Sequence, residues 1–160
     1  MNATEIYISN FNCARTRTLD LLDKIAALPN HGEVLGWRPG PGRAHLAWQF
    51  MHLAITDDRY HHMRIKNEEP KWPELGERFG GGSTPDDDIP SVETIRNYLD
   101  EARQDFIAFI ASLDEAKLDE KPFEDAQRTN HESFELLTWH EAHHQGQAHI
   151  TFNLYNAGGS

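Results

Sequence analysis

Four histidines crowd into the segment TWHEAHHQGQAHI, which spans positions 138 to 150 of the chain. His140 and His144 are separated by four residues, so on a helix they lie one turn apart on the same face. A helix presents two imidazoles to one metal ion in this way. The spacing therefore predicts a metal site, and a hydrogen-bonded core histidine is the competing interpretation of each residue.

The other two histidines of this segment point in different directions. His143 lies about 60° from His140 around the helix, and His149 lies about 180° from it. We expect both to face solvent, a helix flank or a partner subunit, and not to bind metal. Gln147 continues the face of His144 by one turn, so we expect it to contact a metal-bound water or to orient a ligand.

His140, Glu141 and His144 also match the HExxH pattern of zinc peptidases, in which the glutamate is the general base. Such an enzyme takes its third ligand downstream, but residues 145–160 contain no Asp or Glu. The metzincin extension would need Gly and His where this chain has Gln147 and Ile150. We therefore reject a peptidase and keep Glu141 as a candidate acid–base residue, with a solvated surface carboxylate as the alternative.

A catalytic metal site with three protein ligands and one open position needs a third ligand from an earlier helix. The earlier histidines are His31, His45, His52, His61, His62 and His131. Of these, His52 lies in the middle of an apolar helical stretch, whereas the others fall at helix ends or beside charged residues. We therefore predict that His52, His140 and His144 hold one divalent ion. Three neutral imidazoles suit Zn or Ni first, and Fe or Mn as alternatives.

The helices that must position these residues appear as apolar repeats at intervals of three and four. They are expected over residues 4–28, 43–66, 91–113 and 130–155, the last with Asn130 as its N-cap. Residues 67–90, rich in proline and glycine, are expected to form a long functional loop or lid. The chain has no alternating strand pattern, so we predict an all-α four-helix bundle whose helix order periodicity leaves open.

Composition excludes several classes of protein. The chain has 15 Lys+Arg against 26 Asp+Glu and a net charge of −11, so nucleic acid is not expected as a partner. Neither a signal-peptide core nor an apolar run of membrane length occurs, and we expect a cytoplasmic protein that does not enter a membrane. A length of 160 residues suits one domain, 1–160. The single cysteine, Cys13, is expected in the core of the first helix.

The segments WQFMHLAITDDRY and WHEAHHQGQ together resemble the DinB-like four-helix bundles, which are related to the YfiT-like proteins. The resemblance spans the chain, and HxxHHxGQ is its most specific part. It implies metal ligation by His52, His140 and His144, a long crossover connection and a homodimer. Gln145 stands where the family commonly has arginine, a difference that bears on the substrate and not on the metal site.

The family includes enzymes that use a metal to transfer the sulfur of a low-molecular-weight thiol to an electrophile, and others described as metal-dependent hydrolases. The resemblance therefore implies a thiol-dependent S-transferase acting on a small-molecule substrate. The alternatives are a hydrolase, with Glu141, Asp57 or Asp58 moving the proton, and a non-catalytic metal-binding stress protein. For both aspartates a surface position is the competing interpretation. Aromatic residues could line a substrate pocket or belong to the core: Trp48, Tyr60, Trp72 and Phe79.

Overall fold

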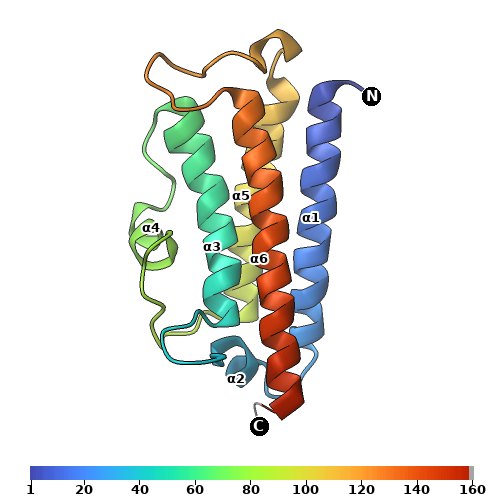
Figure 1. Cartoon of the computed structure of the whole chain (residues 1–160), viewed down its shortest axis with the longest axis vertical. Helices are drawn as coiled ribbons and strands as arrows, with labels where there is room; N and C mark the ends of the chain where they lie inside the picture. The colour runs from blue at the N-terminus through green and yellow to red at the C-terminus, as the bar shows by residue number, and fades with distance from the viewer. Residues whose placement is uncertain (159–160) are drawn as a thin grey trace.

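The computed structural model describes residues 1–158, which contain helices and no strand. The last two residues of the predicted domain, 159 and 160, lie outside the described part. Four long helices form a bundle (Figure 1), which confirms the predicted fold class. The elements are α1 (Ala3–Ala26), α2 (His31–Gly36), α3 (Leu46–Arg59), η1 (Tyr60–Lys66), α4 (Pro73–Phe79), α5 (Val92–Ser112), η2 (Glu115–Lys117) and α6 (Asn130–Gly158).

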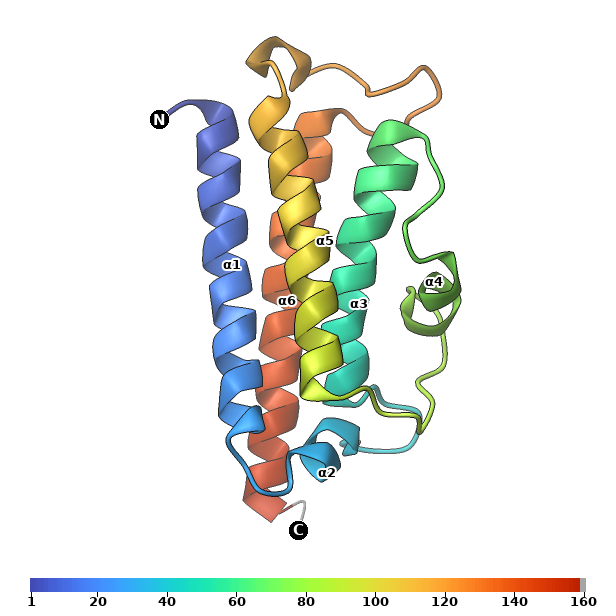
Figure 2. The same ribbon diagram turned by 180° about the vertical axis from the view of Figure 1, so that it is seen from behind.

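The helix order is not a simple up-and-down arrangement. In Figures 1 and 2, α1 and α6 run downwards, whereas α3 and α5 both run upwards. Each long helix packs on two neighbours, because α3 contacts α5 and α6, and α1 contacts the same two helices. Since α3 and α5 are parallel, the chain between them must return along the length of the bundle. This connection is the predicted crossover.

The crossover contains a helix that the sequence did not predict. Residues 67–90 were expected to form a loop, but α4 occupies Pro73–Phe79 within them, with proline in its first turn. A helix of seven residues is too short to display a repeating apolar stripe. The segment is fastened to α3, because Asp58 accepts hydrogen bonds from the backbone N–H groups of Lys71 and Trp72. Phe79 at its end is fully buried.

The start of α6 is capped by a different residue from the one predicted. The backbone N–H of Glu132 donates to Thr129 Oγ1, and the Thr129 N–H donates to the Glu132 carboxylate. This reciprocal pair is a capping box. Asn130 instead donates its side-chain amide to the carbonyl of Lys117. The T-x-x-E spacing that carries this signal was present in the sequence.

The position of Cys13 differs from the predicted one. Cys13 is exposed on α1, so the prediction that it belongs to the core is wrong. The buried stripe of α1 runs through Phe11, Arg15 and Thr18, on the other side of the helix.

In the described residues, none of the helices has the combination of length and hydropathy that crossing a membrane requires.

Four charged side chains meet inside the bundle, one from each long helix. Arg15 of α1 binds Glu141 of α6 at 2.7 Å and Asp57 of α3 at 2.9 Å. Arg103 of α5 binds Asp57 at 2.8 Å and also pairs with Glu141. All four side chains are at most 5% exposed. Two positive and two negative charges thus neutralise each other where a helical bundle would ordinarily be apolar.

Candidate metal centre

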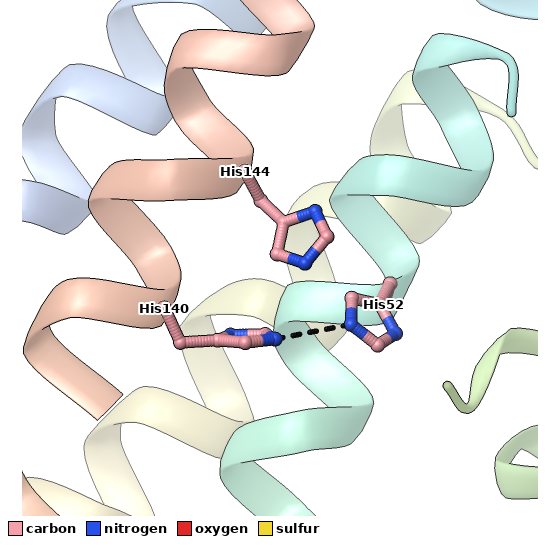
Figure 3. A group of neighbouring side chains, drawn as sticks. All are labelled: His52, His140 and His144. Carbon is pink, nitrogen blue, oxygen red and sulfur yellow. Dashed lines mark hydrogen bonds between the residues drawn. The ribbon is translucent and has the colours of Figure 1, made fainter. Parts of the chain in front are cut away.

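The structure brings His52, His140 and His144 together. One candidate ligand atom from each lies within 4.8 Å of the other two. Figure 3 shows His52 on α3 facing the two histidines of α6, which are one turn apart. The Nε2 atoms of His52 and His140 are 3.1 Å apart. Two nitrogen ligands of a tetrahedral zinc ion, each about 2.0–2.1 Å from it, lie about 3.3 Å apart. The three residues could therefore hold a metal ion with little movement.

His52 is held in the orientation that a ligand needs. Its Nδ1 lies 2.7 Å from the carbonyl oxygen of Phe79, and a carbonyl only accepts, so Nδ1 carries the proton. The lone pair is then on Nε2, the atom that faces His140. Trp48 stacks on the ring, with centroids 4.7 Å apart and planes 7° from parallel. The crossover and α3 together fix both the tautomer and the plane of this imidazole.

Burial keeps the three imidazoles neutral. It lowers the pKa of His140 to about 4 and that of His144 to about 3, with a further contribution from the neighbouring histidines. Burial also lowers the pKa of His52, and the positive charge of Arg59 adds to this effect. In addition, His144 Nδ1 is buried without a hydrogen-bond partner among the described residues. Neutral, closely spaced imidazoles are the form that binds a divalent metal.

Metal affinity is expected to stay nearly constant from about pH 8 down to about pH 5, because the lowered pKa values keep the ligands unprotonated. Histidines with ordinary pKa values near 6.5 would instead lose affinity from about pH 6.5 downwards, up to about tenfold per pH unit for each ligand. Zinc titration against a competing chelator at several pH values measures this. A steep loss just below neutral pH would contradict the expectation.

The remaining residues of the histidine-rich segment lie outside this group. His143 is exposed and stacks on Trp139, with ring centroids 4.9 Å apart. His149 bonds to Gln145 at 3.2 Å. The amide nitrogen of Gln147 lies 2.9 Å from His143 Nε2, and the same side chain opposes part of the fall in the pKa of His144. Gln147 is thus exposed beside the triad, and a role in orienting His144 stays a prediction.

Glu141 is not part of the triad. Its carboxylate is 2% exposed and is held by Arg15, Arg103 and Thr18 Oγ1. The charges of the two arginines, together with the Thr18 hydrogen bond, hold the pKa of the carboxyl at about 2, against the opposing effect of burial. The placement contradicts both the predicted acid–base role and the alternative of a solvated side chain. His140 and Glu141 are adjacent in sequence and point about 100° apart around the helix, so they contact different neighbours.

The two aspartates of α3 are also occupied. Asp57 belongs to the same ion network, and Asp58 accepts from the crossover backbone and lies 2.8 Å from His62 Nδ1. Both are buried, so the interpretation of these residues as surface carboxylates is wrong. Neither is free to move a proton at the triad. The carboxylates considered as proton carriers therefore serve structure.

The earlier histidines that were set aside have other partners. His45 caps α3, with Nδ1 accepting from the backbone N–H of Trp48, and its Nε2 lies 2.9 Å from the Asp86 carbonyl. His131 Nδ1 lies 2.6 Å from the hydroxyl of Tyr7. His61 is buried beside Phe106 and Phe109, and burial lowers its pKa to about 4. None of these three belongs to the group that converges with His52.

A cavity of about 280 Å³ opens beside the triad. Its wall includes His52 and His140, and of the four aromatic candidates only Tyr60 lines it. Phe79 is buried in the core, and Trp72 packs edge-on against Tyr98. The sequence interpretation missed other lining residues, namely Arg59, Arg64, Gly80 and Gly81. Arg59 follows His52 by seven residues and so shares its helix face, a signal that spacing alone could have revealed.

Comparison with known proteins agrees with this fold. The DinB superfamily model matches residues 11–148, a range that contains all three histidines. No curated protein matches the chain. A crystal structure of a conserved protein from Enterococcus faecalis superposes with a TM-score of 0.71, covering 96% of this chain and 97% of that one at 17% identity. That likeness shows a shared fold, and the family match shows that this chain belongs to the DinB superfamily.

Proposed function

We propose that this protein is a metal-dependent enzyme that transfers a low-molecular-weight thiol to a small electrophile. In this proposal His52, His140 and His144 hold one divalent ion, with zinc or nickel preferred. The observation that carries it is the cavity of about 280 Å³ against two of the three imidazoles. Three protein ligands beside open space leave a coordination position for a substrate, as in catalytic sites.

A divalent ion in this position would lower the pKa of a coordinated thiol, which then loses its proton. With the ion held by the three histidines, the thiolate sulfur would bond to the electrophilic carbon, the leaving group would depart with its bonding electrons, and the thiol proton would pass to solvent. The histidines stay neutral throughout, and the hydroxyl of Tyr60 on the cavity wall is available to donate to the electrophile. The protein's own thiol has no part, since Cys13 is exposed on α1 and is not among the residues that line the cavity.

The placement of the carboxylates favours transfer over hydrolysis. A metal-dependent hydrolase usually employs a general base to accept a proton from the attacking water. Glu141 and Asp57 are held by the arginines of the ion network, and Asp58 is held by His62 and the crossover. A coordinated thiol needs no such base, because the ion itself favours its deprotonation. Hydrolysis is the second candidate, supported by the same open side of the triad.

The test compares both activities on one preparation. Zinc-loaded and nickel-loaded protein would be mixed with glutathione, cysteine or 2-mercaptoethanol and with 1-chloro-2,4-dinitrobenzene, and conjugate formation followed by absorbance. The hydrolase arm uses 4-nitrophenyl acetate and 4-nitrophenyl phosphate. Metal-dependent conjugation that His140→Ala abolishes and His143→Ala retains supports the transferase. Hydrolysis with that same dependence, and no conjugation, would replace it with the hydrolase.

We further propose that the partner implied by the family, a second copy of the chain, binds the outer face of α6. Trp139, Ile150 and Leu154 are 58%, 62% and 49% exposed there, three large apolar side chains on one helix. Gly146 lies between them, and a Cβ built at this position meets no atom within 4 Å. An apolar stripe around a small residue allows two helices to approach closely.

Ile150→Glu is therefore expected to convert a dimer into a monomer, because the charge would be buried unpaired at the centre of the contact. Size-exclusion chromatography with light scattering measures the mass directly. Thr16→Glu, at an exposed position of α1, is the matched control and should remain dimeric. A wild-type chain that is monomeric throughout would overturn the dimer proposal.

A further inference from the structure

The cavity beside the triad carries the opposite charge to the rest of the protein. The chain has a net charge of −11, yet the cavity lining contains no aspartate or glutamate. Its charged side chains, apart from the histidines, are Arg59 and Arg64. The positive lining attracts anions to the cavity, whereas the acidic remainder of the protein repels them.

Neither of these arginines has a protein partner. Among residues 1–158, the guanidinium groups of Arg59 and Arg64 form no hydrogen bond and no ion pair, whereas Arg15 and Arg103 are fully paired. Arg59 is only partly exposed, so its guanidinium is partly desolvated without an ion pair to compensate. Glutamates at positions 68, 69 and 77 line an adjoining groove that also reaches Arg59, but none lies within ion-pairing distance of it. The donors of both arginines are thus available to a ligand.

The crossover makes room for the Arg59 guanidinium at the cavity wall. A Cβ at Gly80 would lie 2.7 Å from Arg59 Nη1 and would overlap the carbonyl oxygen of Gly76, so a side chain at Gly80 would collide with both. Side chains on a helix lean towards its N-terminus, which directs Arg59 back towards His52. The two residues are seven positions apart, about 10 Å along the helix axis. A small molecule is long enough to contact both residues.

We propose that Arg59 and Arg64 bind an anionic group, a carboxylate or a phosphate, of the molecule whose other end meets the histidine triad. Guanidinium groups recognise both oxyanions through paired, charge-assisted hydrogen bonds. Leu136, Leu137 and Tyr60 also line the cavity and would cover the carbon skeleton. The cavity of about 280 Å³ is at the small end of ligand sites. The inference rests on the proposed function only in calling this molecule the substrate.

The test measures binding rather than turnover. Succinate and inorganic phosphate would be titrated separately into the full chain, with and without zinc, while the side-chain Nε–H signals of the arginines are followed by NMR. Arg59→Gln and Arg64→Gln assign the two signals and remove the donors. Arg59→Lys and Arg64→Lys keep the charge without the paired donors. Arg17→Gln, an exposed arginine on α1, is the control for net charge.

Saturable shifts of both signals are expected, with affinity falling about tenfold for each Gln substitution, less for each Lys substitution and not for Arg17→Gln. Succinate binding alone identifies a carboxylate, and phosphate binding alone identifies a phosphate. No saturable binding of either anion, or binding that the Gln variants leave unchanged, overturns the inference. Because zinc and turnover are not required, a chain that binds anions but conjugates no thiol keeps this inference and loses the proposed function.

Discussion

His140→Ala is expected to reduce bound metal from about one equivalent to almost none. Loss of a residue that merely supports a ligand costs about 10–100-fold in metal affinity, so loss of a ligand should cost more than about 100-fold. His52→Ala should have the same effect, because its Nε2 faces His140 Nε2 at 3.1 Å. Elemental analysis of untagged protein after exchange into chelator-free buffer gives the metal content.

His143→Ala is the matched control for this result. His143 lies on the same helix, between the two ligand candidates in sequence, but it is exposed and stacks on Trp139. Its loss should leave the metal content unchanged. If wild-type protein takes up no Zn, Ni or Mn, the three histidines form a buried polar cluster and the metalloenzyme proposal fails. Equal metal content in all variants would place the ion elsewhere.

Glu141→Ala is expected to destabilise the fold by about 3–5 kcal/mol, the cost of removing one partner from a buried ion pair. The substitution leaves Arg15 and Arg103 with Asp57 as their only acidic partner, inside a bundle that excludes water. Urea denaturation followed by circular dichroism measures the change. Because the pKa of Glu141 is lowered to about 2, its contribution is present above about pH 4.5 and is lost as the pH falls towards 2.

Glu135→Ala supplies the comparison, since this residue is exposed on the same helix. Its effect should stay within about 0.5 kcal/mol, as for other surface substitutions. A Glu141→Ala protein as stable as the wild type would mean that water or a rearranged Asp57 satisfies both arginines. Glu141 is not a ligand candidate, so folded Glu141→Ala protein should still take up metal at saturation, but with lower affinity because α6 has lost the ion pairs that orient it.

The sequence predicted the elements in which apolar residues recur at a regular local spacing. All four long helices and the convergence of His52, His140 and His144 follow from apolar spacing and from the i, i+4 relation of the last two. The short helices α2 and α4 lie below the length at which spacing is informative. The long crossover connection came from the family resemblance, because periodicity contains no information about helix order.

The ion network was missed because its members need partners from other helices. Arg15 nevertheless follows Phe11 by four residues on the stripe of α1, and Arg103 follows Leu99 in the same way on α5. A charge on a buried stripe predicts an opposite charge on another buried stripe. Applied here, that argument would have placed Glu141 in the core and removed it as a proton carrier.

The four-helix ion network also bears on how the bundle would fold in the absence of metal. Four apolar helices can associate in several rotations with similar burial, but two arginines and two carboxylates neutralise each other in only a few of them. Glu141 is adjacent to His140, so its pairing fixes how α6 is turned and hence where both its imidazoles point. We therefore expect the bundle to fold without a metal ion. A zinc finger is unfolded without metal, whereas we expect this bundle to present its three histidines already assembled, so that a bound ion could be exchanged for another without unfolding.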